Sequence, residues 1–204
     1  MIHRTLLTVL FMTLSFGALA DEKAVPWSLN MYLENDLVND TDQGYTNGIR
    51  FSWISPDVSS YEHDPAIPKW LREANRRLSF FHDEVEGLDR RFVVTLGQLM
   101  FTPADIQQPA LIEDDRPYAG YLYLGLAYHT RDKNQLDTIE LNLGMVGPSS
   151  LAQDAQDLVH EERDIDTAKG WKNQLADEPG IQFIYEHKNR YTLSTRWPQQ
   201  DFIG

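Results

Sequence analysis

The amino-acid sequence predicts an all-β fold, an antiparallel β-barrel of the outer-membrane type. Several segments alternate apolar and polar residues with a period of two, which places the apolar side chains on one face of a sheet. Several segments run for about ten residues, the length of a tilted strand that spans a bilayer. Tyrosine and tryptophan cluster near segment ends, as in the aromatic girdles of such barrels. A soluble sandwich would show nearly the same alternation, so the pattern favours the barrel and leaves the sandwich open.

Residues 1–20 predict a secretory signal peptide. A basic Arg4 precedes an apolar stretch, and the small-x-small pattern Ala18-Leu19-Ala20 places the cleavage after Ala20. The mature chain is therefore expected to be exported.

The alternation begins directly after this leader. Trp27, Leu29 and Met31 are apolar, whereas Ser28 and Asn30 between them are polar. The alternating segments are residues 27–34, 46–53, 121–129, 138–145 and 181–186. We expect about six strands, fewer than the eight of the smallest ordinary barrels. Residues 21–204 are thus expected to form the N-terminal part of a single barrel domain, truncated at Gly204.

Two stretches break the period of two and predict helices. Within residues 64–84, the part 69–81 is compatible with a helix that connects two strands. Residues 147–171 contain the capping-box pattern Ser150-x-x-Gln153, which predicts a helix that continues through about Glu162.

Composition limits the functional classes. The chain has no cysteine, so an exported form must be held by core packing, by a lipid-embedded architecture or by a metal. Its formal net charge of −13 argues against nucleic acid as a partner and suits a surface that binds cations or faces saccharide.

An oxygen-rich turn joins the first two alternating segments. An EF-hand that started at Asp40 would need glycine at its sixth position and an acid at its twelfth, but Tyr45 and Phe51 stand there. A calcium site of another kind and a solvated hairpin tip both remain open. The oxygen-bearing residues are Glu34, Asn35, Asp36, Asn39, Asp40 and Asp42.

The second predicted helix has two unlike faces. One stripe is apolar, and the opposite face carries a histidine, His160, with two glutamines. His160 is either a solvated surface residue or a general base, the latter if the helix lies against a polar lumen or a substrate groove. The sequence contains no motif for a serine nucleophile, no cysteine and no HExxH zinc motif. The stripe consists of Leu151, Ala155, Leu158 and Val159, and the opposite face of Gln153, Gln156 and His160.

Four blocks together resemble the outer-membrane lipid A deacylases, the family that removes the 3′-acyloxyacyl group from lipid A. They read "END…DQGYTNGIRFSW", "DDRPYAGYLYLGL", "NLGMVGPSSLAQDAQDLVH" and "KGWKNQLADEPG", and they span nearly the whole mature chain in order. The resemblance implies a twelve-stranded outer-membrane barrel, of which this chain supplies about the first half, with a short helix carrying the site histidine. It also implies lipid A, in lipopolysaccharide of the outer membrane, as the substrate.

The resemblance further implies how the ester is cleaved. A histidine activates water, and a bound calcium ion polarises the ester carbonyl and stabilises the oxyanion. On this chain the histidine is His160 and the glutamine four residues earlier is Gln156. The family's Asn-Asp pair falls on Asn35 and Asp36, which are the implied calcium ligands, and its threonine falls on Thr46.

Two features of the family pattern have no clear counterpart here. A carboxylate follows the family's histidine, and in "HEERDID" Glu162, Asp164 and Asp166 all remain candidates. Some relatives carry a basic pair after the third strand, where this chain has Gln107 and Gln108, so that Arg116 is the nearest cation for a phosphate. Two other classes also remain: a non-catalytic barrel acting as a pore or structural protein, and a soluble calcium-binding β-protein.

Overall fold

The computed structural model describes residues 27–35, 47–78, 87–164, 166–191 and 202–203. The predicted signal peptide and most of the oxygen-rich turn lie outside these residues, as does Gly204.

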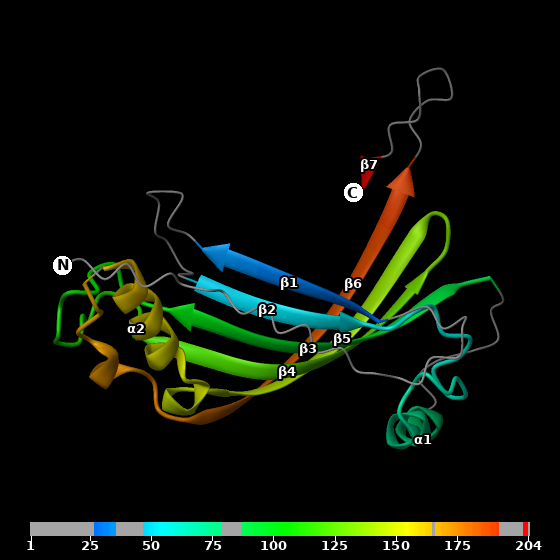
Figure 1. Ribbon diagram of the computed structural model, residues 1–204, viewed down its shortest axis with the longest axis horizontal. Helices are drawn as coiled ribbons and strands as arrows, with labels where there is room; N and C mark the ends of the chain where they lie inside the picture. Colours follow the sequence, from blue (N-terminus) through cyan, green and yellow to red (C-terminus); the bar gives the residue numbers. More distant parts are fainter. Residues whose placement is uncertain (1–26, 36–46, 79–86, 165, 192–201, 204) are drawn as a thin grey trace, which may run out of the picture.

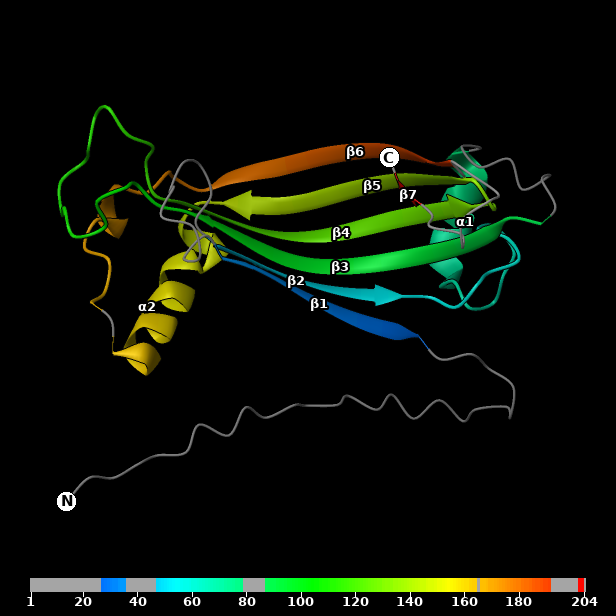
Figure 2. The same cartoon turned by 90° about the horizontal axis from the view of Figure 1, so that it is seen from above.

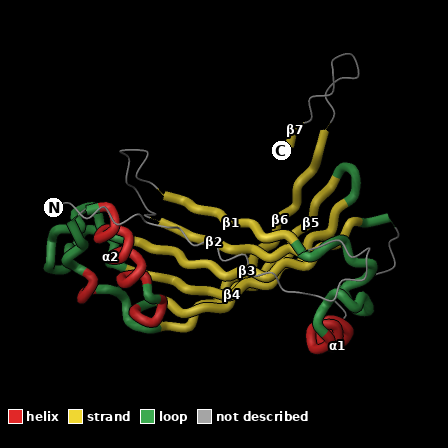
Figure 3. The backbone as a smooth tube through the Cα atoms, in the orientation of Figure 1, coloured by secondary structure: helices red, strands yellow, loops and turns green. Residues whose placement is uncertain are grey.

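The described chain forms one antiparallel sheet in which each strand pairs with the next along the sequence. The sheet is curved and open, with β1 at one edge and β6, followed by the very short β7, at the other (Figures 1 and 3). This confirms the expected all-β fold with the architecture of an outer-membrane barrel wall. The strands are β1 (Ser28–Asn35), β2 (Asn47–Ile54), β3 (Asp89–Phe101), β4 (Ala119–Arg131), β5 (Gln135–Val146), β6 (Glu178–Tyr191) and β7 (Phe202–Ile203).

The two faces of the sheet differ in chemistry. On the concave face Arg50 of β2 reaches across two strands to Glu140 of β5, with 3.3 Å between Nη2 and Oε2, and Glu140 is only 5 % exposed. Ser52 and Thr95 form a hydroxyl pair between β2 and β3, 3.3 Å apart. The alternate residues point to the convex face, where large apolar side chains remain exposed in the middle of the strands. They include Leu29, Met31, Leu96, Leu124, Leu141, Leu143, Ile181 and Phe183. Polar inside and apolar outside is the arrangement of a barrel in lipid.

Strand β3 does not alternate apolar and polar residues, because both of its faces are covered. Val93 and Thr95 are buried on one face, while Phe92 and Met100 are buried on the other, where segments from two long connections pack on them. A strand buried on both sides does not show the period of two.

The connection from β2 to β3 folds back onto the convex face and carries helix α1 (Lys69–Leu78), within the predicted range 69–81. Leu71 of α1 joins a buried cluster with Tyr61 and Phe92. Asn75 is anchored twice: the Tyr128 hydroxyl donates to its Oδ1 at 2.7 Å, and its Nδ2 donates to the carbonyl of Tyr61 at 2.8 Å. Burial raises the pKa of Tyr61 to about 12, so this phenol stays neutral.

The connection from β5 to β6 carries a short 3-10 turn (Pro148–Ser150) and helix α2 (Ala152–Arg163), which confirms the second predicted helix. Helix α2 lies at the opposite end of the sheet from α1 (Figure 2). Neither described helix is long and apolar enough to cross a bilayer.

Candidate active site

Helix α2 packs on the apolar face of the sheet and not against the polar lumen, which was one of the two positions that the sequence left open. The Gln98 amide donates to the carbonyl of Ser150 at 2.7 Å, and Met100 is buried against Ala152. Gln98 and Met100 continue the alternate row of β3 that includes the exposed Leu96. The helix therefore stands outside the barrel wall, on the side that faces lipid.

The start of α2 differs from the predicted capping box. The N-cap residue is Leu151, in the left-handed conformation with φ of 58°, and no side chain caps the helix. The Ser150 hydroxyl instead donates to the carbonyl of Gly147 at 2.6 Å. A Cβ at Gly120 of β4 would collide with Ser150 and Ala152, so glycine is required for this close approach. The tight packing of the turn on β4 takes the place of a cap.

Gln156 holds α2 against the underlying loops. It is 6 % exposed, and its Oε1 accepts a hydrogen bond of 2.7 Å from the indole Nε1 of Trp171. Trp171 is itself 1 % exposed and packs on the ring of Tyr118, with 4.8 Å between centroids. The predicted polar face of α2 is thus partly a buried anchoring face.

His160 lies one turn after Gln156, half-buried, and its Nδ1 is 2.7 Å from the carbonyl oxygen of Asp166. A carbonyl can only accept, so Nδ1 carries the proton and Nε2 presents a lone pair. Among the three candidate acids after the histidine, it is Asp166 that contacts it, through its backbone. A histidine fixed in this tautomer is arranged to take a proton at Nε2.

The apolar stripe of α2 does not pack against protein. Leu151, Leu158 and Val159 are 55 %, 61 % and 42 % exposed, respectively, and only Ala155 of the stripe is partly buried. An inverted pattern, with glutamine buried and leucine exposed, is expected for a helix whose open side faces hydrocarbon. The stripe extends the apolar surface of the sheet up to the histidine.

Two loops support this arrangement. The backbone N–H of Lys169 donates to the carbonyl of Ile106 at 2.9 Å, which joins the loop after α2 to the β3–β4 loop. Arg116, considered above as a cation for a phosphate, donates from Nε to the carbonyl of Thr102 at 2.5 Å and closes the base of the β3–β4 loop. Gln107 likewise donates to a backbone carbonyl, that of Thr167, at 3.3 Å. The hydrogen bonds of these two side chains therefore stabilise the conformation of the loops.

Of the remaining predicted site residues, the structure describes only the backbone of Asn35, which lies at the same end of the sheet as α2. Asn35, the last residue of β1, pairs with Asn47, which pairs in turn with Met100 under α2. The backbone of Asn35 is therefore two strands, about 10 Å, from Met100. Asp36, Thr46 and the side chain of Asn35 lie outside the described residues, so their convergence on His160 stays a prediction. Within the described ranges, no group of three or more acidic, histidine or cysteine residues forms a metal site.

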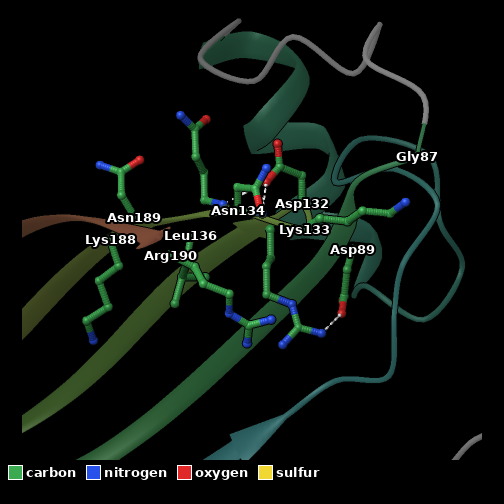
Figure 4. A pocket seen from close by; sticks show the side chains of 11 residues that line it. Gly87, Asp89, Asp132, Lys133, Asn134, Leu136, Lys188, Asn189 and Arg190 are labelled. Carbon is green, nitrogen blue, oxygen red and sulfur yellow. Dashed lines mark hydrogen bonds and ion pairs between the residues drawn. The ribbon is translucent and has the colours of Figure 1, made fainter. Parts of the chain in front are cut away.

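A cavity of about 530 Å³ lies at the other end of the sheet, around the β4–β5 turn and the end of β6 (Figure 4). Its wall includes Arg131, which forms an ion pair of 2.9 Å with Asp89. Lys188 and Arg190 line it from β6. The cavity is remote from α2 and is not part of the candidate site.

Trp171 and the pair Ser149 and Asp177 were not selected from the sequence. Asp177 accepts from the Ser149 amide at 2.8 Å and from its hydroxyl at 2.7 Å, which ties the two ends of the β5–β6 connection together. An isolated tryptophan in a polar loop is a signal for burial that could have identified Trp171.

Comparison with known proteins identifies relatives. A family described as "Outer membrane protein LpxR" matches residues 6–203. The solved structure of LpxR from Salmonella typhimurium superposes with a TM-score of 0.58 at 14 % sequence identity, covering 86 % of this chain and 57 % of that one. At that identity the likeness shows the fold, and the chain spans little more than half the length of that protein. No curated protein matches the chain.

Proposed function

The chain belongs to the LpxR family of outer membrane proteins, and we propose that it is a lipid A deacylase that hydrolyses the ester-linked 3′-acyloxyacyl chain of lipid A. The chain is located in the outer membrane, which contains lipid A. The proposal concerns the reaction, the residues that perform it and the metal.

The observation that supports it most is the position of α2 on the lipid-facing side of the wall. His160 and the exposed Leu158 and Val159 belong to one short helix, so a basic nitrogen stands beside a surface that suits acyl chains. A lipid in the membrane reaches this surface by lateral diffusion. A histidine in the lumen would be separated from such a substrate by the barrel wall.

In the proposed reaction His160 is the general base. Its Nε2 takes a proton from a water molecule whose oxygen attacks the ester carbonyl, and the imidazolium then gives the proton to the leaving alkoxide. The Asp166 carbonyl 2.7 Å from Nδ1 holds the ring in the required tautomer and accepts from the imidazolium. Gln156 acts as a positioning residue, because its hydrogen bond with Trp171 fixes α2 on the wall.

We further propose a calcium requirement. Asn35 and Asp36 would hold the ion through side-chain oxygens, the donor type that hard cations prefer, and Thr46 follows across the same hairpin. Bound there, the ion would polarise the ester carbonyl and stabilise the oxyanion.

Mass spectrometry of lipid A from cells that express the full-length protein tests the reaction. The wild type should yield lipid A lacking the 3′-acyloxyacyl chain, whereas His160→Gln should yield unmodified lipid A at equal protein abundance. His63→Gln is the matched control, since His63 is an exposed histidine in the connection that carries α1, at the other end of the sheet. Deacylation by His160→Gln within a few fold of the wild type would contradict the assignment, and unmodified lipid A with the wild type would favour a non-catalytic barrel.

The metal is tested separately on purified protein. Chelation should abolish hydrolysis and added calcium should restore it, while Asp36→Ala should be inactive at calcium concentrations that saturate the wild type. Full activity in excess chelator would remove the metal from the proposal.

A further inference from the structure

Helix α1 occupies a position on the outer wall that the deacylase reaction does not use. It packs on the apolar face of β3 and β4 through Leu71, and Asn75 binds Tyr128 of β4. The position is at the opposite end of the sheet from α2, so any role of α1 is separate from the candidate active site (Figure 1).

The direction of α1 relates it to the plane of the membrane. In Figure 1 the helix is seen nearly end-on while the strands run across the view, and in Figure 2 it lies across the strands. Strands of a barrel span the bilayer, so a helix that crosses them on the outer face lies along the membrane surface.

The connections show which surface this is. At the α1 end, β4 and β5 are joined by residues 132–134 alone, and the β2–β3 connection, residues 55–88, is long because it carries α1 back onto the wall. At the α2 end the connections formed by residues 102–118 and 147–177 are both long. Outer-membrane barrels have short turns toward the periplasm and long loops outside. Helix α1 therefore lies at the level of the inner leaflet, which consists of phospholipid.

The exposed side of α1 has the chemistry of an interfacial helix. Trp70 is 65 % exposed, and tryptophan prefers the boundary between headgroups and acyl chains. Three exposed basic residues, Lys69, Arg76 and Arg77, stand in a chain whose net charge is −13, and the single acid of the helix, Glu73, pairs with both arginines. Arg77 pairs with Glu73 at 3.7 Å and is still 79 % exposed. The fourth basic residue, Arg72, is half-buried and donates to the carbonyls of His63 and Asp64, each at 3.2 Å.

The neighbouring wall has the same character. Trp27 and Trp53 are 41 % and 37 % exposed at this end of β1 and β2, and the ring of Trp27 contacts Phe92 edge-on with 6.5 Å between centroids. Exposed tryptophan beside basic side chains is the composition of a membrane–water boundary.

We propose that α1 is an interfacial anchor that binds the headgroup phosphates of inner-leaflet phospholipids and inserts Trp70 among their glycerol and upper acyl groups. The basic side chains attract anionic lipid, and the contact of Leu71 and Asn75 with the wall fixes the helix at that depth. The inference rests on the outer-membrane location and is independent of the deacylase activity.

Residues 1–204 contain no cysteine, so one substitution introduces a single site for a fluorophore within them. The full-length protein with Trp70→Cys, or in a second reporter Lys69→Cys, is labelled and reconstituted in phosphatidylcholine vesicles. Lipids that carry a nitroxide at the headgroup or at the end of an acyl chain then quench the label according to its depth. Lys133→Cys is the matched control, because Lys133 is exposed in the β4–β5 turn at the same end of the sheet.

The Trp70 label should be quenched severalfold more strongly by the headgroup nitroxide than the Lys133 label, and only weakly by the chain-end nitroxide. Phosphatidylglycerol in the vesicles should increase this quenching, and Arg76→Gln/Arg77→Gln should abolish the increase. Equal quenching of the Trp70 and Lys133 labels would overturn the proposal, and so would protection of both α1 labels from nitroxide by a bound periplasmic protein. Far-UV circular dichroism shows that each variant is folded, and lipid A hydrolysis measured on the same samples reports on the deacylase proposal separately.

Discussion

The hydrogen bond between Trp171 and Gln156 offers a direct test of how α2 is held on the wall. Trp171→Phe keeps an aromatic ring in the buried cluster but removes the N–H that donates to Gln156 at 2.7 Å. Gln156 is 6 % exposed, so its Oε1 loses its partner in a site with little access to water. An unpaired buried acceptor costs about 1–3 kcal/mol. We expect a local destabilisation of α2 by about 2 kcal/mol, which corresponds to about 30-fold less protection of its amides from hydrogen exchange.

A double-mutant cycle separates the hydrogen bond from the packing. Gln156→Met leaves the indole N–H unpaired and should cost a similar amount, but Trp171→Phe/Gln156→Met removes both polar partners together. The double variant should therefore be more stable than the sum of the two single effects predicts, by about 1–2 kcal/mol. The measurement is hydrogen exchange of the α2 amides in the reconstituted protein, with the β4 amides as an internal reference. Additive single effects, or equal loss of protection in β4, would refute the view that this bond holds the helix.

Three further outcomes are expected. Gly147→Ala should destabilise the start of α2 by about 1–3 kcal/mol, because φ is +101° and a Cβ would lie 2.6 Å from a backbone oxygen of the loop before β6; normal protection of the α2 amides would contradict this. The hydrogen bonds from the Ser149 hydroxyl and amide hold the pKa of the Asp177 carboxyl below its usual range. The stabilisation that they provide is therefore present above the pKa of this carboxyl in the unfolded chain, and it is lost as the pH falls through its pKa in the folded protein. Limited proteolysis of the β5–β6 connection should increase below about pH 4, and Ser149→Ala should lessen that pH dependence. Tyr61→Phe removes a buried hydroxyl that donates to a β4 carbonyl at 2.5 Å, so α1 should become about 1–2 kcal/mol less protected from exchange, with α2 unchanged.

Much of the sheet could be predicted because a wall between lipid and a polar lumen alternates by necessity. β1, β2, β4, β5 and β6 each overlap a predicted segment. β3 could not be found in this way, because the residues that cover it come from connections distant in sequence. The side on which a connection folds is a tertiary property that no local pattern records.

The candidate site was predictable to a different degree. The resemblance selected Gln156 and His160, and the structure places both on α2 at the outer wall. An amphipathic helix of a soluble protein buries its apolar stripe, but a helix that faces lipid reverses this rule, and most of the stripe of α2 is exposed. The partner of His160 could not be foreseen either, because a backbone carbonyl leaves no signature in the sequence. The calcium site stays a prediction.

The two helices cover opposite ends of one outer face and leave the middle of the strands bare. That bare band, which includes Leu96, Leu124 and Leu141, has a height set by protein packing rather than by the bilayer. If the hydrocarbon layer of a membrane is thicker than this height, either the membrane must thin around the protein or the surfaces of the two helices must enter the hydrocarbon. The thickness of the bilayer therefore affects the position of α2, and of the His160 that it carries, relative to the membrane.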